Sequence, residues 1–138
     1  MVPSLLFTSG ARMHRSRLST FVIDCQSEDI EQATAFWSQA LGRPAKPPVP
    51  DSGNYRELTS SPNEPLLLIQ KVDHPGRIHL DIEADDLDAE VRRLEALGAK
   101  RVEFIKRWWV MEAPTGQRFC VVRPQKGPLD EGNSNEWR

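Results

Sequence analysis

The sequence contains an internal repeat, and this repeat constrains the fold more than any other feature. Asp81 follows Asp24 by 57 positions, and the Ala-Leu-Gly triplet of residues 40–42 returns at residues 96–98. A repeat of this length indicates that one supersecondary unit occurs twice in the chain. We therefore expect two halves with the same order of helices and strands.

Each half begins with a strand and an amphipathic helix. Residues 18–25 are apolar and β-branched, which favours a strand, and residues 27–42 carry apolar side chains at helical spacing. Asp29 has the spacing of an N-terminal cap, and Gly42 stands where a left-handed residue ends a helix. The pattern restarts with a strand over 77–84 and a helix over 85–98, capped by Asp85 or Asp86 and ended by Gly98.

Three strands are expected to follow the helix in each half. The sequence offers strand-like segments at residues 54–60, 64–72, 100–107, 107–113 and 117–124. The prolines within residues 43–50 exclude a central strand there. A sheet with a helix on one face needs a second cover, which can be the other half, a partner chain or a ligand. A concave sheet face is therefore a candidate ligand pocket.

Charge and hydropathy exclude two classes of partner. The formal net charge is −2, from 18 basic and 20 acidic residues without a basic block, so we expect no nucleic-acid partner. No apolar run approaches the roughly 20 residues of a membrane span, so we expect no membrane partner and a cytoplasmic location. Cys25 and Cys120 lie in apolar segments typical of reduced core cysteines.

The strand at residues 77–84 carries the most suggestive polar side chains. Alternation along a strand places His79, Asp81 and Glu83 on one face, with Ile78, Leu80 and Ile82 on the other. A histidine beside a carboxylate can be a metal ligand, a general base or an ordinary paired histidine. We name His79 and Asp81 as candidate catalytic residues.

Three segments resemble the vicinal oxygen chelate superfamily, which includes glyoxalases, bleomycin-resistance proteins and extradiol dioxygenases. They are "ATAFWSQALG", "IHLDIEADDLDAEVRRLEALGA" and "APTGQRFCVVRP". The glyoxalase-like subgroup is the most similar. The resemblance implies an α+β fold in which two βαβββ modules form a cupped, barrel-like mixed sheet with the helices outside, and it favours a homodimer.

The resemblance also sets the domain boundaries that we expect. A single domain covers residues 17–124, with module one at 17–73 and module two at 74–124. Residues 1–16 are predicted to be a flexible extension, and residues 125–138 a polar tail.

Metal-dependent members of the superfamily hold their ion with four residues in the cup. These positions fall on Thr20, on Leu68 (or Gln70 if the register slips), on His79 and on Cys120. Only His79 is retained as a good ligand, so we expect no metal and no other cofactor. The alternative is one divalent ion (Zn, Ni, Mn or Fe) on a non-standard set of His79 with Cys120 and Asp24, and Asp81 beside them.

The remaining candidates are polar and aromatic side chains that strand alternation or the helix pattern brings near the cup. The full set of predicted ligand-binding residues is Thr20, Asp24, Trp37, Glu57, Gln70, His79, Trp108, Trp109, Glu112, Arg118 and Cys120. Aromatic side chains can stack on flat organic ligands, and arginines can pair with anionic groups. In the first strand Phe21 and Ile23 should face the helix, and in the last strand Phe119 and Val121 should do so.

These observations leave three functions open. The favoured one is a metal-independent protein that binds a small organic molecule in the cup. The second is an enzyme, a lyase, isomerase or dioxygenase, that uses His79 as a metal ligand or general base. The third is an interaction module whose cup is filled by its own side chains.

Overall fold

The computed structural model describes residues 13–50 and 52–138, so most of the extension expected at residues 1–16 lies outside the described residues. The described residues form two helices and eight strands in a mixed α+β fold, which confirms the predicted fold class. In chain order they are β1 His14–Gln26, α2 Ile30–Leu41, β2 Tyr55–Leu58, β3 Leu66–Val72, β4 Arg77–Ala84, α3 Leu87–Ala96, β5 Lys100–Ile105, β6 Trp108–Glu112, β7 Arg118–Val122 and β8 Asn135–Trp137.

The chain divides into two compact units, which we describe separately. The first unit is Ser19–Asp81, and the second unit comprises the described residues up to Leu18 together with Ile82–Arg138. Each boundary passes through a strand, within β1 and within β4. The predicted module boundary at residues 73 and 74 instead falls in the turn between β3 and β4.

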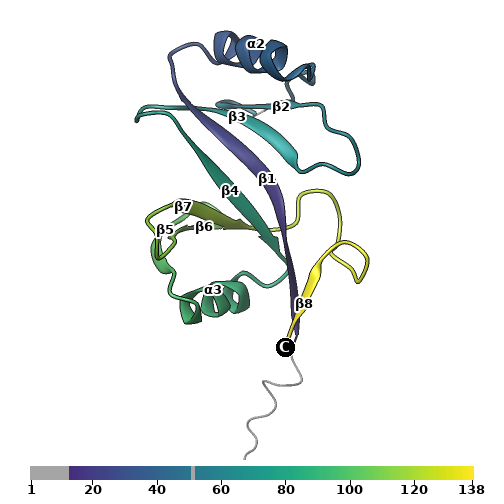
Figure 1. The fold of residues 1–138 in the computed structure, drawn as a ribbon, viewed down its shortest axis with the longest axis vertical. Helices are drawn as coiled ribbons and strands as arrows, with labels where there is room; N and C mark the ends of the chain where they lie inside the picture. Colours follow the sequence, from purple (N-terminus) through teal and green to yellow (C-terminus); the bar gives the residue numbers. More distant parts are fainter. Residues whose placement is uncertain (1–12, 51) are drawn as a thin grey trace, which may run out of the picture. The chain divides into compact units, whose positions relative to one another are not determined.

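The core of the first unit lies between α2 and strands β2 and β3 (Figure 1). Its buried members are Ile23, Leu58, Leu67 and Ile69. Helix α2 begins as predicted, because the Asp29 carboxylate accepts hydrogen bonds from the backbone N–H groups of Glu31 and Gln32. It ends at Gly42, whose φ of 68° is the left-handed conformation expected there.

Strand pairing in the first unit fixes which side chains share a face. Strand β3 runs parallel to β1 and antiparallel to β2, so the hydrogen-bonded order is β2-β3-β1. A third module-one strand was predicted after the helix. Among the described residues, its place between α2 and β2 holds only an isolated β-bridge between Ala45 and Leu58. The prolines on both sides of Ala45 remove backbone donors, which explains why pairing stops at one bridge.

The core of the second unit lies between α3 and strands β5, β6 and β7 (Figure 1). Leu87, Val91 and Leu94 of α3 pack with Met111 and Val121. Asp86, one of the two predicted caps, accepts a hydrogen bond from the backbone N–H of Ala89.

The structure places strand residues in both terminal segments that are predicted to lie outside the domain. Strand β1 begins at His14, inside the expected extension, and β8 lies inside the expected polar tail. The two pair antiparallel, with His14 opposite Trp137 and Ser16 opposite Asn135 (Figure 1). The Trp137 indole N–H also donates to Ser16 Oγ over 2.8 Å.

A buried charged cluster underlies this strand pair in the second unit. Glu90 of α3 is fully buried and accepts two hydrogen bonds from the Arg93 guanidinium, at 2.9 and 2.8 Å. His14 Nε2 lies 2.7 Å from Glu90 Oε1, and the Arg93 guanidinium stacks 3.8 Å from the Trp137 ring centroid. Charge pairing of this kind is what allows a carboxylate to be buried.

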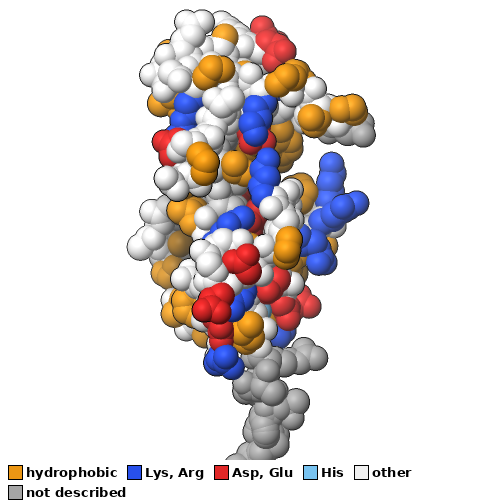
Figure 2. Space-filling view, turned by 90° about the vertical axis from the view of Figure 1, so that its right-hand side faces the viewer, with side chains coloured by type: hydrophobic (Ala, Val, Ile, Leu, Met, Phe, Trp, Pro, Cys, Tyr) orange, Lys and Arg blue, Asp and Glu red, His pale blue; other side chains and the backbone are white. Residues whose placement is uncertain are grey.

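Among the described residues, neither helix is long and apolar enough to span a membrane. Figure 2 shows acidic and basic side chains interspersed on one face of the molecule, in keeping with the small net charge.

Candidate ligand-binding site in the first unit

Side-chain alternation gives the first unit a face against α2 and a face opposite α2. Phe21 and Ile23 pack in the core on the α2 side, which confirms their predicted direction. Thr20, Val22 and Asp24 therefore point to the opposite face, where they pair in register with Leu66, Leu68 and Gln70. All three β1 residues on this face are buried.

His79 is held on the face opposite α2 by a buried carboxylate. Its Nδ1 lies 2.8 Å from Asp24 Oδ2, and the Asp24 side chain is only 2% exposed against 13% for His79. When Nδ1 carries the proton, it donates to Asp24, and Nε2 is the ring nitrogen on the side of Asp81. Asp24 thus sets the orientation and tautomer of the imidazole.

Asp81 lies on the other side of the imidazole. Its Oδ1 is 3.5 Å from His79 Nε2, and the Asp81 side chain is 16% exposed. Among the described residues, Asp24 Oδ1 and Asp81 Oδ1 are buried without a hydrogen-bond partner. Buried polar atoms normally have partners, so the two oxygens mark unused acceptor capacity around His79.

A second polar pair extends the same face toward β2. Gln70, the register partner of Asp24, donates from Nε2 to the Tyr55 hydroxyl over 2.9 Å. Glu57, on the same face, forms an ion pair with Lys46 at 2.8 Å. The face opposite α2 therefore presents a row of polar groups running from Tyr55 through Gln70 and Asp24 to His79.

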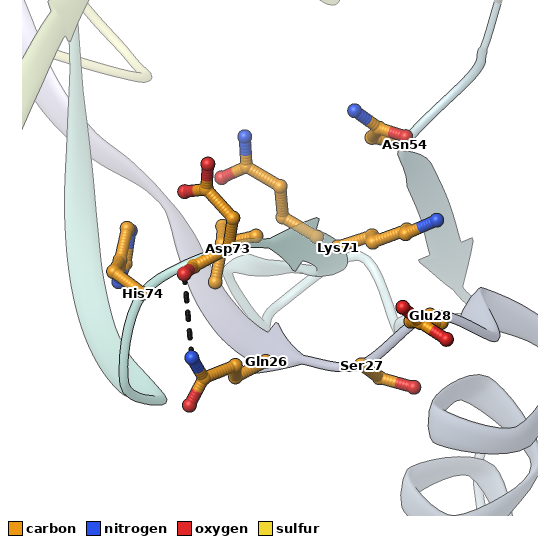
Figure 3. Close-up of a pocket in the computed structure, with 9 residues that line it drawn as sticks. Gln26, Ser27, Glu28, Asn54, Lys71, Asp73 and His74 are labelled. Carbon is orange, nitrogen blue, oxygen red and sulfur yellow. Dashed lines mark hydrogen bonds between the residues drawn. The ribbon is translucent and has the colours of Figure 1, made fainter.

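A cavity opens at the end of this row, beside the C-terminal ends of β1 and β3. Its volume is about 790 Å³, within the range of small-molecule sites. Gln70 belongs to both the polar row and the cavity wall. Figure 3 shows Gln26, Asp73 and His74 on one side of the cavity, with Lys71 reaching toward Asn54 and Glu28 on the other.

The other predicted site residues separate into core and surface positions. Trp37 packs against the core of the first unit, and Trp109 packs against the core of the second. Both tryptophans therefore stabilise helix–sheet packing. Phe119 and Val121 of β7 also pack in the second core, as their predicted direction requires.

Four predicted site residues belong to β6 and β7 of the second unit. Glu112 and Arg118 face each other in register and form an ion pair at 3.2 Å. Trp108 and Cys120 are partly buried on the same two strands.

The first unit does not reproduce the four-ligand metal set that the resemblance implies. Thr20 is buried with its hydroxyl 3.1 Å from Ser19 Oγ, and Leu68 has no ligand atom. Gln70 is engaged with Tyr55, which leaves His79 as the one strong ligand type at these positions in the first unit. Of the non-standard set, Asp24 and Asp81 contact His79, and Cys120 belongs to the second unit.

Sequence reasoning missed two residues of the site. Tyr55 was not named, although its place opposite Gln70 follows from a two-strand pairing. Arg77 was also missed; its Nε lies 3.6 Å from Asp24 Oδ2 and adds a positive charge beside the carboxylate. Arg77 is two residues before His79 on the same strand, so alternation could have indicated it.

The fold is that of a glyoxalase-like protein. The family described as "Glyoxalase-like domain" matches residues 20–122, and the chain belongs to this family. No curated protein matches the sequence.

Solved structures share the fold at low sequence identity. A hypothetical protein from Bacillus halodurans is 12% identical with a TM-score of 0.55, covering 83% of this chain and 99% of its own. Methylmalonyl-CoA epimerase from Mycobacterium tuberculosis is 21% identical with a TM-score of 0.50, covering 78% of this chain and 87% of its own. The Mn(II)-bound glyoxalase from Novosphingobium aromaticivorans is 18% identical with a TM-score of 0.51, covering 84% of this chain and 44% of its own.

Proposed function

We propose that this glyoxalase-like protein binds a small organic molecule at His79, on the face opposite α2, without a metal ion. The observation that carries the proposal is the 2.8 Å contact between His79 Nδ1 and the buried Asp24 carboxylate. A histidine fixed through one ring nitrogen presents the other in a defined direction, which is what ligand recognition needs.

The exposures of the three side chains assign them different roles. Asp24 is sealed from solvent and positions the imidazole, whereas His79 and Asp81 retain some exposure and can meet a ligand. The partly exposed Asp81 carboxylate beside His79 favours a ligand that brings a hydrogen-bond donor. The incomplete metal set among Thr20, Leu68 and Gln70 supports binding without an ion.

The second candidate is an enzyme in which His79 acts as general base. The Asp24–His79 pair supports it, because a base oriented by a buried carboxylate is a recurring catalytic arrangement. A ligand proton would pass to His79 Nε2 while Nδ1–H keeps its bond to Asp24. The structural neighbours named above include two enzymes, an epimerase and a glyoxalase.

Binding and metal content are tested together. The wild type, His79→Ala and an exposed-carboxylate control, Glu64→Ala, are screened by thermal shift against small organic fragments in buffer with a chelator. In parallel, metal content is measured after incubation with zinc, nickel, manganese or ferrous iron and removal of free ions. Fragments that stabilise the wild type and the control, but not His79→Ala, support the proposal.

Two outcomes overturn it. About one metal ion per chain, lost in His79→Ala, would refute binding without metal. An absence of stabilising fragments would refute the binding function and favour a cup filled by side chains. The homodimer and the cytoplasmic location remain predictions, and sedimentation of the purified protein tests the first.

A further inference from the structure

The cavity at the ends of β1 and β3 carries charges that the His79 site does not use. Its wall is formed by Gln26, Ser27, Glu28, Asn54, Gln70, Lys71, Val72, Asp73 and His74. All nine belong to the first unit, and Val72 is the only apolar side chain among them. The other eight wall residues have polar or charged side chains, which can pair with polar groups of a ligand.

Opposite charges stand on opposite sides of this cavity. Figure 3 shows the Lys71 side chain extending between Asn54 and Glu28, while Asp73 lies on the side of His74. Among the described residues, the structure records no ion pair for either Lys71 or Asp73. The cavity therefore offers one positive and one negative group that a ligand could pair at the same time.

Neighbouring groups strengthen each side. Asn54 can donate from its carboxamide next to Lys71, which suits a carboxylate. On the other side, Gln26 Nε2 donates to the Asp73 backbone carbonyl over 3.3 Å and ties the turn to the end of β1. Gln70 uses its amide N–H on Tyr55, so its carbonyl oxygen is the group that can accept from an ammonium.

We infer that this cavity binds a zwitterion, a ligand with an ammonium group and a carboxylate at opposite ends. The carboxylate pairs with Lys71 and Asn54, and the ammonium pairs with Asp73 and the Gln70 carbonyl. Glu28 lies on the Lys71 side of the cavity (Figure 3), so the ligand carboxylate has to approach Lys71 and Asn54 on the face of Lys71 turned away from Glu28. The inference does not depend on the function proposed at His79, and Gln70 is the residue that the cavity shares with the polar row beside that site.

The test compares three probes that share a five-carbon chain. They are 5-aminopentanoate, which carries both charges, pentylamine, which carries only the ammonium, and pentanoate, which carries only the carboxylate. Binding to the full chain is followed by ¹H–¹⁵N chemical-shift titration. Because each charge-assisted pair contributes a separate increment, the zwitterion should bind at least about tenfold more tightly than either single-charge probe.

Two variants and a control assign the ends of the ligand. Lys71→Met should weaken 5-aminopentanoate about tenfold and leave pentylamine unchanged, because the ammonium does not use Lys71. Asp73→Asn should weaken the zwitterion and pentylamine but not pentanoate. Glu64→Gln removes an exposed carboxylate that pairs with Arg43 outside the cavity and should change nothing.

Three results would overturn the inference. Pentylamine that binds as tightly as the zwitterion would show a merely acidic surface. Equal affinities of the wild type and Lys71→Met for 5-aminopentanoate would show that Lys71 does not bind the carboxylate. No chemical-shift change with any probe would show that the cavity holds only solvent.

Discussion

Replacing Arg93 with Met tests how the second unit keeps a carboxylate buried. The change retains most of the side-chain stem and removes both charge-assisted hydrogen bonds to Glu90, at 2.9 and 2.8 Å. Breaking a buried ion pair by removing one partner destabilises a protein by about 3–5 kcal/mol. Arg93 is 25% exposed and His14 still contacts Glu90, so we expect the lower end, about 3 kcal/mol.

The pH dependence of this loss has a definite sign. Burial raises the pKa of Glu90, but the hydrogen bonds from Arg93, His14 and Ser16 more than offset it, so the pKa lies below the ordinary 4.5. A carboxylate with a lowered pKa stabilises the fold above its unfolded pKa, and this contribution is lost as pH falls through the folded pKa. Without Arg93 the burial effect dominates and the folded pKa rises.

Urea unfolding at about pH 7.5 and about pH 4.5 measures both effects. The difference in unfolding free energy between wild type and Arg93→Met should be larger at the higher pH. It should be smaller at the lower pH, because protonation of Glu90 removes the unpaired buried charge of the variant. The matched control is Arg92→Met, an exposed arginine on the same helix, which should change stability by less than about 0.5 kcal/mol. A loss below about 1 kcal/mol in Arg93→Met, or one that does not narrow with pH, would refute the reasoning.

Three further predictions concern single residues. Asp29→Ala removes the cap of α2 and should lower the unfolding free energy by about 1 kcal/mol in urea titrations, whereas an unchanged midpoint would contradict the capping role. Gly42→Ala should lower the unfolding free energy by about 1–2 kcal/mol, because of its φ of 68° alone. Gly98→Ala should lower it further, because the new Cβ would also lie 3.0 Å from Pro114 Cγ. Equal losses of stability in urea titrations would show that Pro114 moves aside. Burial raises the pKa of the Cys25 thiol, so in a Cys120→Ala background it should react with a disulfide reagent at about pH 8 more slowly than free cysteine; a reaction as fast as that of free cysteine would contradict its burial.

Sequence reasoning predicted the regular elements well where the signals are local. The cap at Asp29, the left-handed Gly42 and the alternation of Phe21 and Ile23 each depend on a few neighbouring residues, and the structure confirms all three. Strand β8 could not be found in this way, because its three residues lie in a polar segment and their partner is more than 100 positions away. Pairing at that separation follows from tertiary structure and not from local propensity.

The candidate site shows the same limit. Alternation correctly put His79 and Asp81 on one face, and it put Asp24 on the corresponding face of β1. It could not tell that His79 bonds most closely to Asp24, 55 positions away, and not to its neighbour Asp81. Trp37 and Trp109, two of the three tryptophans named for the ligand site, pack against the two cores, because their large apolar surface is stabilised by burial there.

The pairing of β8 with the start of β1 also means that the order of the elements along the chain can be rewritten. His14 and Trp137 are register partners, so their backbones lie about 5 Å apart, and a short glycine-rich linker could join them in a variant that lacks residues 1–13. New ends could then be opened at the exposed turn of residues 61–64 between β2 and β3. Such a circular permutant would begin with β3 and end with β2 while keeping each strand pair described above. A folded permutant would show that the fold depends on which strands pair and not on where the polypeptide begins.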